Sequence, residues 1–155
     1  MLQYGGEANL SHINPRHPKT PDISEENGRT INCVCCAIAT DIYNSVDIKF
    51  TAPGVTNRLP WYLIEQVYGE EFKLVASLND IKEKLSEPES RGIVLIQSYD
   101  QIEYSEFNHV FNAMNKEGEV VFMDGQENRI VEGIEERDSL TTDILLLTIK
   151  LVQVY

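Results

Sequence analysis

Hydrophobic and polar positions in the first half of the chain repeat with a helical period. Cys36, Ala37, Ala39 and Tyr43 fall on one helical stripe at i, i+1, i+3 and i+7. The pattern predicts a helix of about ten to twelve residues that starts near Cys33.

Two shorter helices are expected after it. Pro60 is tolerated in the first turn of a helix over 61–68, and Gly69 is well placed to end that helix. Ser77 and the polar residues after it supply an N-cap signal before a third helix, over 81–85. The first half of the chain is therefore predicted to be helical.

The second half has a different pattern. Short runs rich in β-branched and aromatic residues are separated by turn residues, and they span 93–97, 109–115, 119–124 and 144–154. Helices followed by strands predict an α+β fold, in which N-terminal helices pack on a mostly antiparallel β-sheet.

Residues 1–31 show no sustained apolar period. They are rich in Asn, Pro, Gly and charged residues, so we expect an extended N-terminal arm or linker there. The remaining residues, 32–155, are expected to form one domain. A chain of 155 residues with 42% hydrophobic composition is long enough to bury a core of its own.

The charge of the chain is strongly negative. Asp and Glu number 25 against 13 Lys and Arg, which gives a formal net charge of −12. Such a field repels phosphate backbones, so we expect no nucleic acid partner. We also expect no membrane insertion, because the apolar run 144–154 contains Lys150 and is too short to span a bilayer.

All three cysteines lie in the segment Cys33-Val34-Cys35-Cys36, which is a poor framework for disulfides. A helix N-terminus lowers the pKa of a thiol, because its unpaired N–H groups and positive dipole end favour the thiolate. Cys33 stands at the predicted helix start and is the first candidate nucleophile. The alternative interpretation is three small buried apolar residues.

His109 lies in a strand-like run, where a histidine is more often structural than catalytic. A two-residue loop at 116–117 would place His109 directly opposite Asp124 in the following strand. Cross-strand neighbours are close enough for an imidazole N–H to reach a carboxylate. A bulge at Gly118 would change this register, and the alternative interpretation of Asp124 is a plain turn aspartate.

Metal and nucleotide chemistry find little support in the sequence. The cysteine segment lacks a second pair of zinc ligands at matching spacing, and His12 and His17 stand in the Pro-rich first segment. The nine glycines form neither a P-loop nor a dinucleotide fingerprint. We therefore expect no metal site and no cofactor.

Four blocks of sequence together resemble the papain-fold toxin domains, described as glutamine deamidases, at the C-termini of bacterial polymorphic toxins and secreted effectors. The blocks are Asn32-Cys33-Val34-Cys35-Cys36-Ala37-Ile38-Ala39-Thr40-Asp41, Arg91-Gly92-Ile93-Val94, His109-Val110-Phe111-Asn112-Ala113-Met114-Asn115 and Val121-Phe122-Met123-Asp124-Gly125-Gln126. They occur in the family's order over about 32–126, which is more specific than any single block.

The resemblance implies a papain-like catalytic domain with a Cys–His–Asp triad made of Cys33, His109 and Asp124. Cys36 matches a frequent but more variable cysteine of the family and is the alternative nucleophile. Cys35 is an addition of this sequence. The family usually has glycine where this chain has Asn108.

The implied reaction converts a glutamine side chain of a target protein to glutamate through a thioester, without metal or organic cofactor. Backbone N–H groups at the helix start would stabilise the oxyanion, with Asn32 or Gln126 as side-chain donors or supporting residues. The resemblance further implies a domain delivered from a bacterium into the cytosol of a target cell, as part of a larger toxin, and a cognate immunity protein.

Two other functions remain open. The same triad would serve a cysteine peptidase, or in a lesser variant a transglutaminase-like enzyme, because only the substrate groove decides which amide is attacked. A non-enzymatic acidic protein that binds a basic surface, such as an immunity protein, would also suit the net charge.

Overall fold

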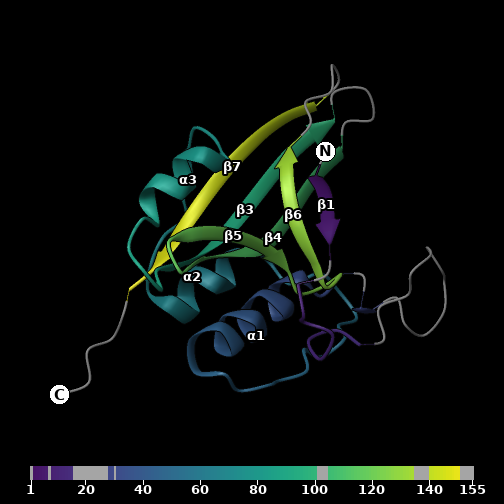
Figure 1. Cartoon of the computed structure of the whole chain (residues 1–155). Helices are drawn as coiled ribbons and strands as arrows, with labels where there is room; N and C mark the ends of the chain where they lie inside the picture. Colours follow the sequence, from purple (N-terminus) through teal and green to yellow (C-terminus); the bar gives the residue numbers. More distant parts are fainter. Residues whose placement is uncertain are drawn as a thin grey trace.

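The part of the chain that the structure describes consists of one antiparallel sheet with helices on both faces (Figure 1). The computed structural model describes residues 2–6, 8–15, 28–29, 31–100, 105–134 and 140–150. The helices are α1 (Cys33–Val46), α2 (Tyr62–Tyr68) and α3 (Leu78–Lys84). The strands are β1 (Leu2–Gly6), β2 (Lys73–Val75), β3 (Arg91–Asp100), β4 (Ser105–Lys116), β5 (Glu119–Asp124), β6 (Arg129–Ile134) and β7 (Leu140–Ile149).

The seven strands of this sheet lie in the order β1-β6-β5-β4-β3-β7-β2, and every neighbouring pair is antiparallel. The α+β class and the antiparallel sheet predicted from the sequence are therefore confirmed. The papain-like relation stays a prediction.

The three predicted helices are present, with small differences in their bounds. Helix α1 begins at Cys33 and runs for 14 residues, slightly longer than expected. Gly69 ends α2 with a φ of 67°, a left-handed conformation that glycine adopts without strain. Helix α3 begins at Leu78 rather than at residue 81, because the Ser77 hydroxyl accepts a hydrogen bond from the Asp80 N–H and caps the helix there.

Strand β3 shows how the sheet is covered on both faces. Ile93 and Leu95 are fully buried and pack with residues of α1 and α2. Val94 and Ile96 point to the opposite face, where they pack with α3. Because alternate residues of a strand face opposite sides of a sheet, a continuous apolar run such as Ile93 to Ile96 suits a central strand buried on both faces.

The hairpin turn between β4 and β5 differs from the predicted one. The sequence prediction placed the two-residue loop at 116–117, but Lys116 pairs with Glu119 in the sheet. The loop is therefore Glu117-Gly118, and these residues have φ values of 55° and 91°. Two positive φ values in a row are typical of the type I′ turn, and glycine at the second position makes that turn accessible.

This shift changes which residue faces His109. The β4–β5 ladder ends at Asn112 and Met123, and its register, extended to His109, would place Gln126 opposite it. The predicted direct pairing of His109 with Asp124 is therefore wrong. The observed register differs from the predicted one by two residues. Because side chains of a strand alternate between faces with a period of two, His109 and Asp124 still lie on the same face of the hairpin.

Three strands were not predicted from the sequence. Strand β2 has only three residues, β1 ends in Gly5-Gly6, and β6 contains both charged residues and a glycine. None of them shows the alternating or continuous apolar pattern that predicts a strand. Pairing with neighbouring strands of the sheet stabilises them instead.

Residues 8–15 and 28–29, within the segment predicted to be an arm or linker, contact the domain. Leu10 and Ile13 are buried and pack with Cys36, Ala39 and Met123. The division of the chain at residue 31 stays a prediction, since much of the segment lies outside the described residues.

Candidate functional site

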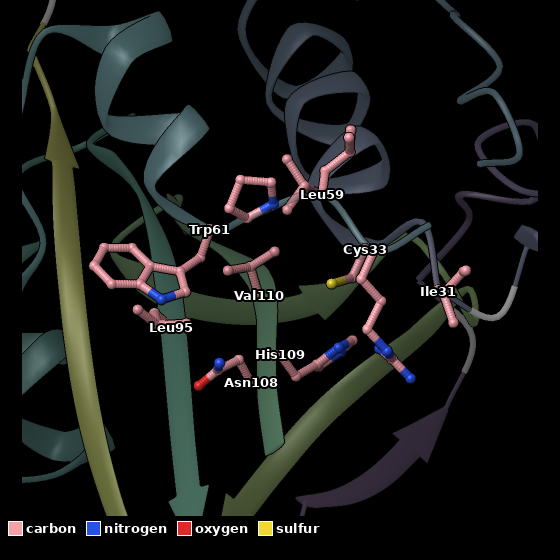
Figure 2. A pocket seen from close by; sticks show the side chains of 11 residues that line it. Ile31, Cys33, Leu59, Trp61, Leu95, Asn108, His109 and Val110 are labelled. Carbon is pink, nitrogen blue, oxygen red and sulfur yellow. The ribbon is translucent and has the colours of Figure 1, made fainter. Parts of the chain in front are cut away.

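Cys33 is the first residue of α1, and its side chain is only 8% exposed. The Asn112 side-chain amide on β4 donates a hydrogen bond to the Ala37 carbonyl oxygen at 2.9 Å. This bond ties the beginning of α1 to the strand that carries His109, and so brings the thiol and the imidazole together. Figure 2 shows the sulfur of Cys33 and the ring of His109 on the same side of a cavity.

His109 and Asp124 form a short hydrogen bond, with 2.6 Å between His109 Nε2 and Asp124 Oδ2. The second carboxylate oxygen, Oδ1, accepts a hydrogen bond from the backbone N–H of Gln126 at 2.9 Å. Both side chains are buried. Asp124 is thus held in place by its own turn while it orients the imidazole through Nε2.

The turn that carries Asp124 fits tightly against α1. A Cβ atom added to Gly125 would collide with the hydroxyl of Thr40 on α1 and would crowd Ile13. Only glycine allows this close approach, so Gly125 brings the end of β5 against the helix that begins with Cys33.

The thiol of Cys33 and the ring of His109 line the same cavity, and each acts on the pKa of the other. Since Nε2 of the ring bonds Asp124, Nδ1 is the nitrogen left for the sulfur. Burial raises the pKa of the Cys33 thiol, but the hydrogen bond and positive charge of His109, together with the backbone N–H of Val110, outweigh burial and lower the pKa overall. The site therefore favours a thiolate.

The pKa of His109 moves in the opposite direction. Burial alone would lower it, but the charge and hydrogen bond of Asp124, followed by those of Cys33, raise the pKa of His109 to about 10. A lowered thiol pKa beside a raised imidazole pKa favours a thiolate–imidazolium ion pair.

The other two cysteines have a different environment. Burial raises the pKa of Cys36 far above that of an ordinary thiol, and the negative charge of Asp124 adds to the rise. Burial and then the charge of Cys33 raise the pKa of the half-buried Cys35. Physical chemistry thus favours Cys33 over the alternative nucleophile Cys36.

Asn32 and Gln126, the predicted oxyanion or supporting residues, contact each other. The Gln126 side-chain amide donates to Asn32 Oδ1 at 3.2 Å. Both N–H groups of the Asn32 amide are used, in bonds to Asn14 Oδ1 at 3.1 Å and to a backbone carbonyl of the loop after α1 at 3.0 Å. The geometry fits a supporting role for Asn32, which fixes the helix start next to the Asp124 turn.

Asn14 and Arg29 belong to the same buried network, and neither was predicted from the sequence. Arg29 donates to Asn14 Oδ1 at 3.1 Å, and the Asn14 amide donates to the carbonyl oxygens of Arg29 and Gln126 at 2.8 and 2.9 Å. Both residues stand in a turn-rich segment without periodicity, so no local pattern pointed to them.

A cavity of about 270 Å³ opens beside Cys33 and His109 (Figure 2). A larger hollow of about 800 Å³ lies elsewhere, but none of the described residues that line it is a Cys or a His. The smaller cavity therefore adjoins the candidate chemistry. It is lined by Ile31, Cys33, Val34, Arg58, Leu59, Pro60, Trp61, Leu95, Asn108, His109 and Val110.

Within the described ranges, no group of three or more His, Cys, Asp or Glu side chains is arranged to hold a metal ion. The helices of the same part of the chain are too short or too polar to cross a membrane.

No protein-family model matches this sequence, and no curated protein matches it. Two similar solved structures are both of a Salmonella effector, SpvD. Its G161 variant is 18% identical with a TM-score of 0.48, over 87% of this chain and 82% of that chain. Its R161 variant is 16% identical with a TM-score of 0.47, over 89% of this chain and 83% of that chain.

Proposed function

We propose that this chain is a papain-like cysteine hydrolase that deamidates a glutamine side chain of a target protein, with Cys33 as nucleophile. One observation carries the proposal. Cys33 at the start of a helix lines one cavity together with His109, and the His109 ring is hydrogen-bonded to the Asp124 carboxylate. Thiol-based acyl transfer needs a nucleophile, a base and a carboxylate that orients the base, in this order.

In the first half of the reaction, the Cys33 thiolate attacks the carboxamide carbon and forms a carbon–sulfur bond. The protonated His109 donates its proton to the departing nitrogen, which leaves as ammonia when the carbon–nitrogen bond breaks. The product is a thioester between Cys33 and the former glutamine side chain.

In the second half, a water molecule attacks the thioester and His109 accepts its proton. The carbon–sulfur bond breaks, glutamate is released and the thiolate–imidazolium pair is restored. The reaction consumes one water and releases one ammonia for each glutamine. The first N–H groups of α1, which precede the first intrahelical bond from the Cys36 N–H to the Asn32 carbonyl oxygen, are suited to stabilise the oxyanion.

The papain-like relation, the delivery from a bacterium into a target cell and the existence of an immunity protein belong to the same proposal. A nucleophile on a helix start, with its histidine and aspartate on neighbouring strands of a sheet, supports the first of these. The others rest on the resemblance of the sequence blocks to bacterial toxin domains.

The test is incubation of the protein with extract from candidate target cells, followed by mass spectrometry. Deamidation predicts glutamine-to-glutamate conversions that are absent with Cys33→Ala and present with Cys36→Ala, a matched control at a neighbouring cysteine. New peptide termini without conversions would identify a peptidase and refute the deamidase. Identical results with the wild type and Cys33→Ala would refute an enzyme that uses this site.

A further inference from the structure

The wall of the cavity beside the candidate nucleophile differs in composition from the chain as a whole. Acidic residues outnumber basic ones by 25 to 13 in the sequence, yet among the described residues no Asp or Glu lines this cavity. Its charged side chains are Cys33, His109 and Arg58. The Asp124 carboxylate lies behind the imidazolium, 2.6 Å from His109 Nε2, and Arg58 adds a positive charge to the cavity wall.

Most of the cavity wall is apolar. Leu95 and Val110 form a buried floor on the sheet. Trp61 forms a side wall of the cavity. Its ring packs edge-on against the ring of Phe72, with 5.8 Å between ring centroids. Leu59, which is 37% exposed, lines the same cavity and lies above Cys33 in Figure 2. A volume of about 270 Å³ is below that of a drug-sized ligand pocket and suits a few neighbouring side chains of a larger substrate.

Arg58 is exposed, and its guanidinium makes no hydrogen bond and no ion pair within the described part of the chain. A guanidinium keeps its charge at any physiological pH and binds carboxylates through two parallel N–H groups. Arg58 is therefore available to a group that enters the cavity from outside.

We infer that this cavity selects the target glutamine by its neighbours: a bulky apolar side chain seated against Trp61 and Leu95, and a carboxylate paired with Arg58. The substrate class is thus a protein segment in which the attacked glutamine lies beside one apolar and one acidic residue. Trp61 and Arg58 are specificity-determining residues in this inference, which rests on the proposed function. It goes beyond that function, because the triad alone does not distinguish one glutamine from another.

The experiment uses short peptides in which the glutamine is replaced by its diazoketone analogue, which alkylates a thiolate at the glutamine side-chain position. One flanking residue is Leu or Ala, the other is Glu or Gln, and both orders are made. The rate of Cys33 alkylation in the full chain is followed by intact mass and divided by the rate with iodoacetamide, which carries no side chain.

We expect Leu to react about tenfold faster than Ala, and Glu about three- to fivefold faster than Gln at low salt. Arg58→Ala should remove the preference for Glu, whereas Arg58→Lys should retain part of it, and added salt should weaken it. Trp61→Ala should remove the preference for Leu. Leu59→Ala, at an exposed position, provides a second variant if Trp61→Ala does not fold. The exposed Lys82 lines the larger hollow instead, so Lys82→Ala should keep both preferences.

The outcomes separate the inference from the function on which it rests. Rates that do not depend on the flanking residues, a Glu preference that survives Arg58→Ala, or a Leu preference that survives Trp61→Ala overturn the inference and leave the proposed deamidase intact. If iodoacetamide labels Cys33 but no diazoketone peptide does, the glutamine site itself is refuted, and the inference with it.

Discussion

Two buried carboxylates of this chain have nearly matching partners, yet only one of these two lies in the site that contains the Cys33 thiol. Asp124 bonds His109 Nε2 at 2.6 Å and a backbone N–H through its other oxygen. Asp41 of α1 accepts from Nε of Arg91 at 2.8 Å and from the Tyr68 hydroxyl at 2.9 Å. Each carboxylate therefore has one cationic and one neutral donor.

The difference lies in the cation. The imidazole of His109 can gain and lose a proton, whereas the guanidinium of Arg91 stays charged. Burial and the neighbouring carboxylate of Asp41 also raise the pKa of Tyr68, so its hydroxyl keeps its proton. The Asp41 cluster thus joins α1, α2 and β3 by fixed charges, while the Asp124 pair can move a proton beside a thiol. A buried carboxylate marks a reactive site only when its partner can titrate.

The largest expected effect is the loss of activity in Cys33→Ala. Without the thiol no thioester forms, so the rate of ammonia release should fall by about 10⁴-fold or more. The thermal midpoint should change little, because the side chain is small and lies at the cavity edge. Cys36→Ala is the matched control, and loss of activity in that variant alone would move the nucleophile to Cys36. A toxic effect that survives Cys33→Ala would instead favour the non-enzymatic binding protein.

Asp124→Asn should reduce the rate by about 10³-fold, since the imidazole loses the partner that orients it and supports its charge. The cost in stability should be small, because His109 can become neutral and leaves no buried charge unpaired. Steady-state kinetics and urea unfolding on the same preparation test both statements. A large loss of stability without loss of activity would contradict the proposed role of Asp124.

Asp41→Asn should show the reverse pattern. The guanidinium of Arg91 cannot discharge, so the free energy of unfolding should fall by about 3 kcal/mol, while the rate per folded molecule should stay within about twofold of the wild type. Urea unfolding and kinetics at a temperature where the variant is folded provide the measurement. Equal effects of Asp41→Asn and Asp124→Asn on activity would mean that the two clusters do not differ as described.

The smallest expected effect is that of pH on the wild-type rate. Outside a plateau, the rate should fall about tenfold for each pH unit. The acid limb should lie below the ordinary thiol range, because the pKa of Cys33 is lowered, and below it the thiolate takes up a proton. The alkaline limb should lie near pH 10, because the pKa of His109 is raised to about 10, and above it the imidazolium is lost as proton donor. Initial rates of ammonia release across this range, with iodoacetamide labelling as an independent readout of the thiolate, test the prediction. An acid limb at the pKa of an ordinary thiol would contradict the ion pair.

Local sequence signals predicted the elements whose ends depend on single residues. The start of α1 at Cys33, the end of α2 at Gly69 and the strand β5 were all predicted from neighbours in the sequence. The hairpin turn was missed by one position, since Glu117 adopts a positive φ that non-glycine residues rarely accept. Strand pairing on both sides of the hairpin outweighs this local cost.

Residues that lie far apart in the sequence were the ones missed. Arg91 and Asp41 are separated by 50 positions in the sequence. Arg58 and Trp61 line the same cavity as His109, although they lie far from it in the sequence. No periodicity connects such positions, because each helix or strand sets only the direction of its own side chains.

The sequence by itself determined the α+β class, the helix start at Cys33 and the three residues proposed for the triad, because these depend on periodicity, capping and the resemblance of short blocks. Only the tertiary structure decided that Cys33 and His109 line the same cavity, that Cys36 is buried with a raised pKa and that Arg58 and apolar residues complete the wall of that cavity. The physical reason is that pKa values and cavities depend on burial and on the distances between charges, and these arise only when distant segments pack together.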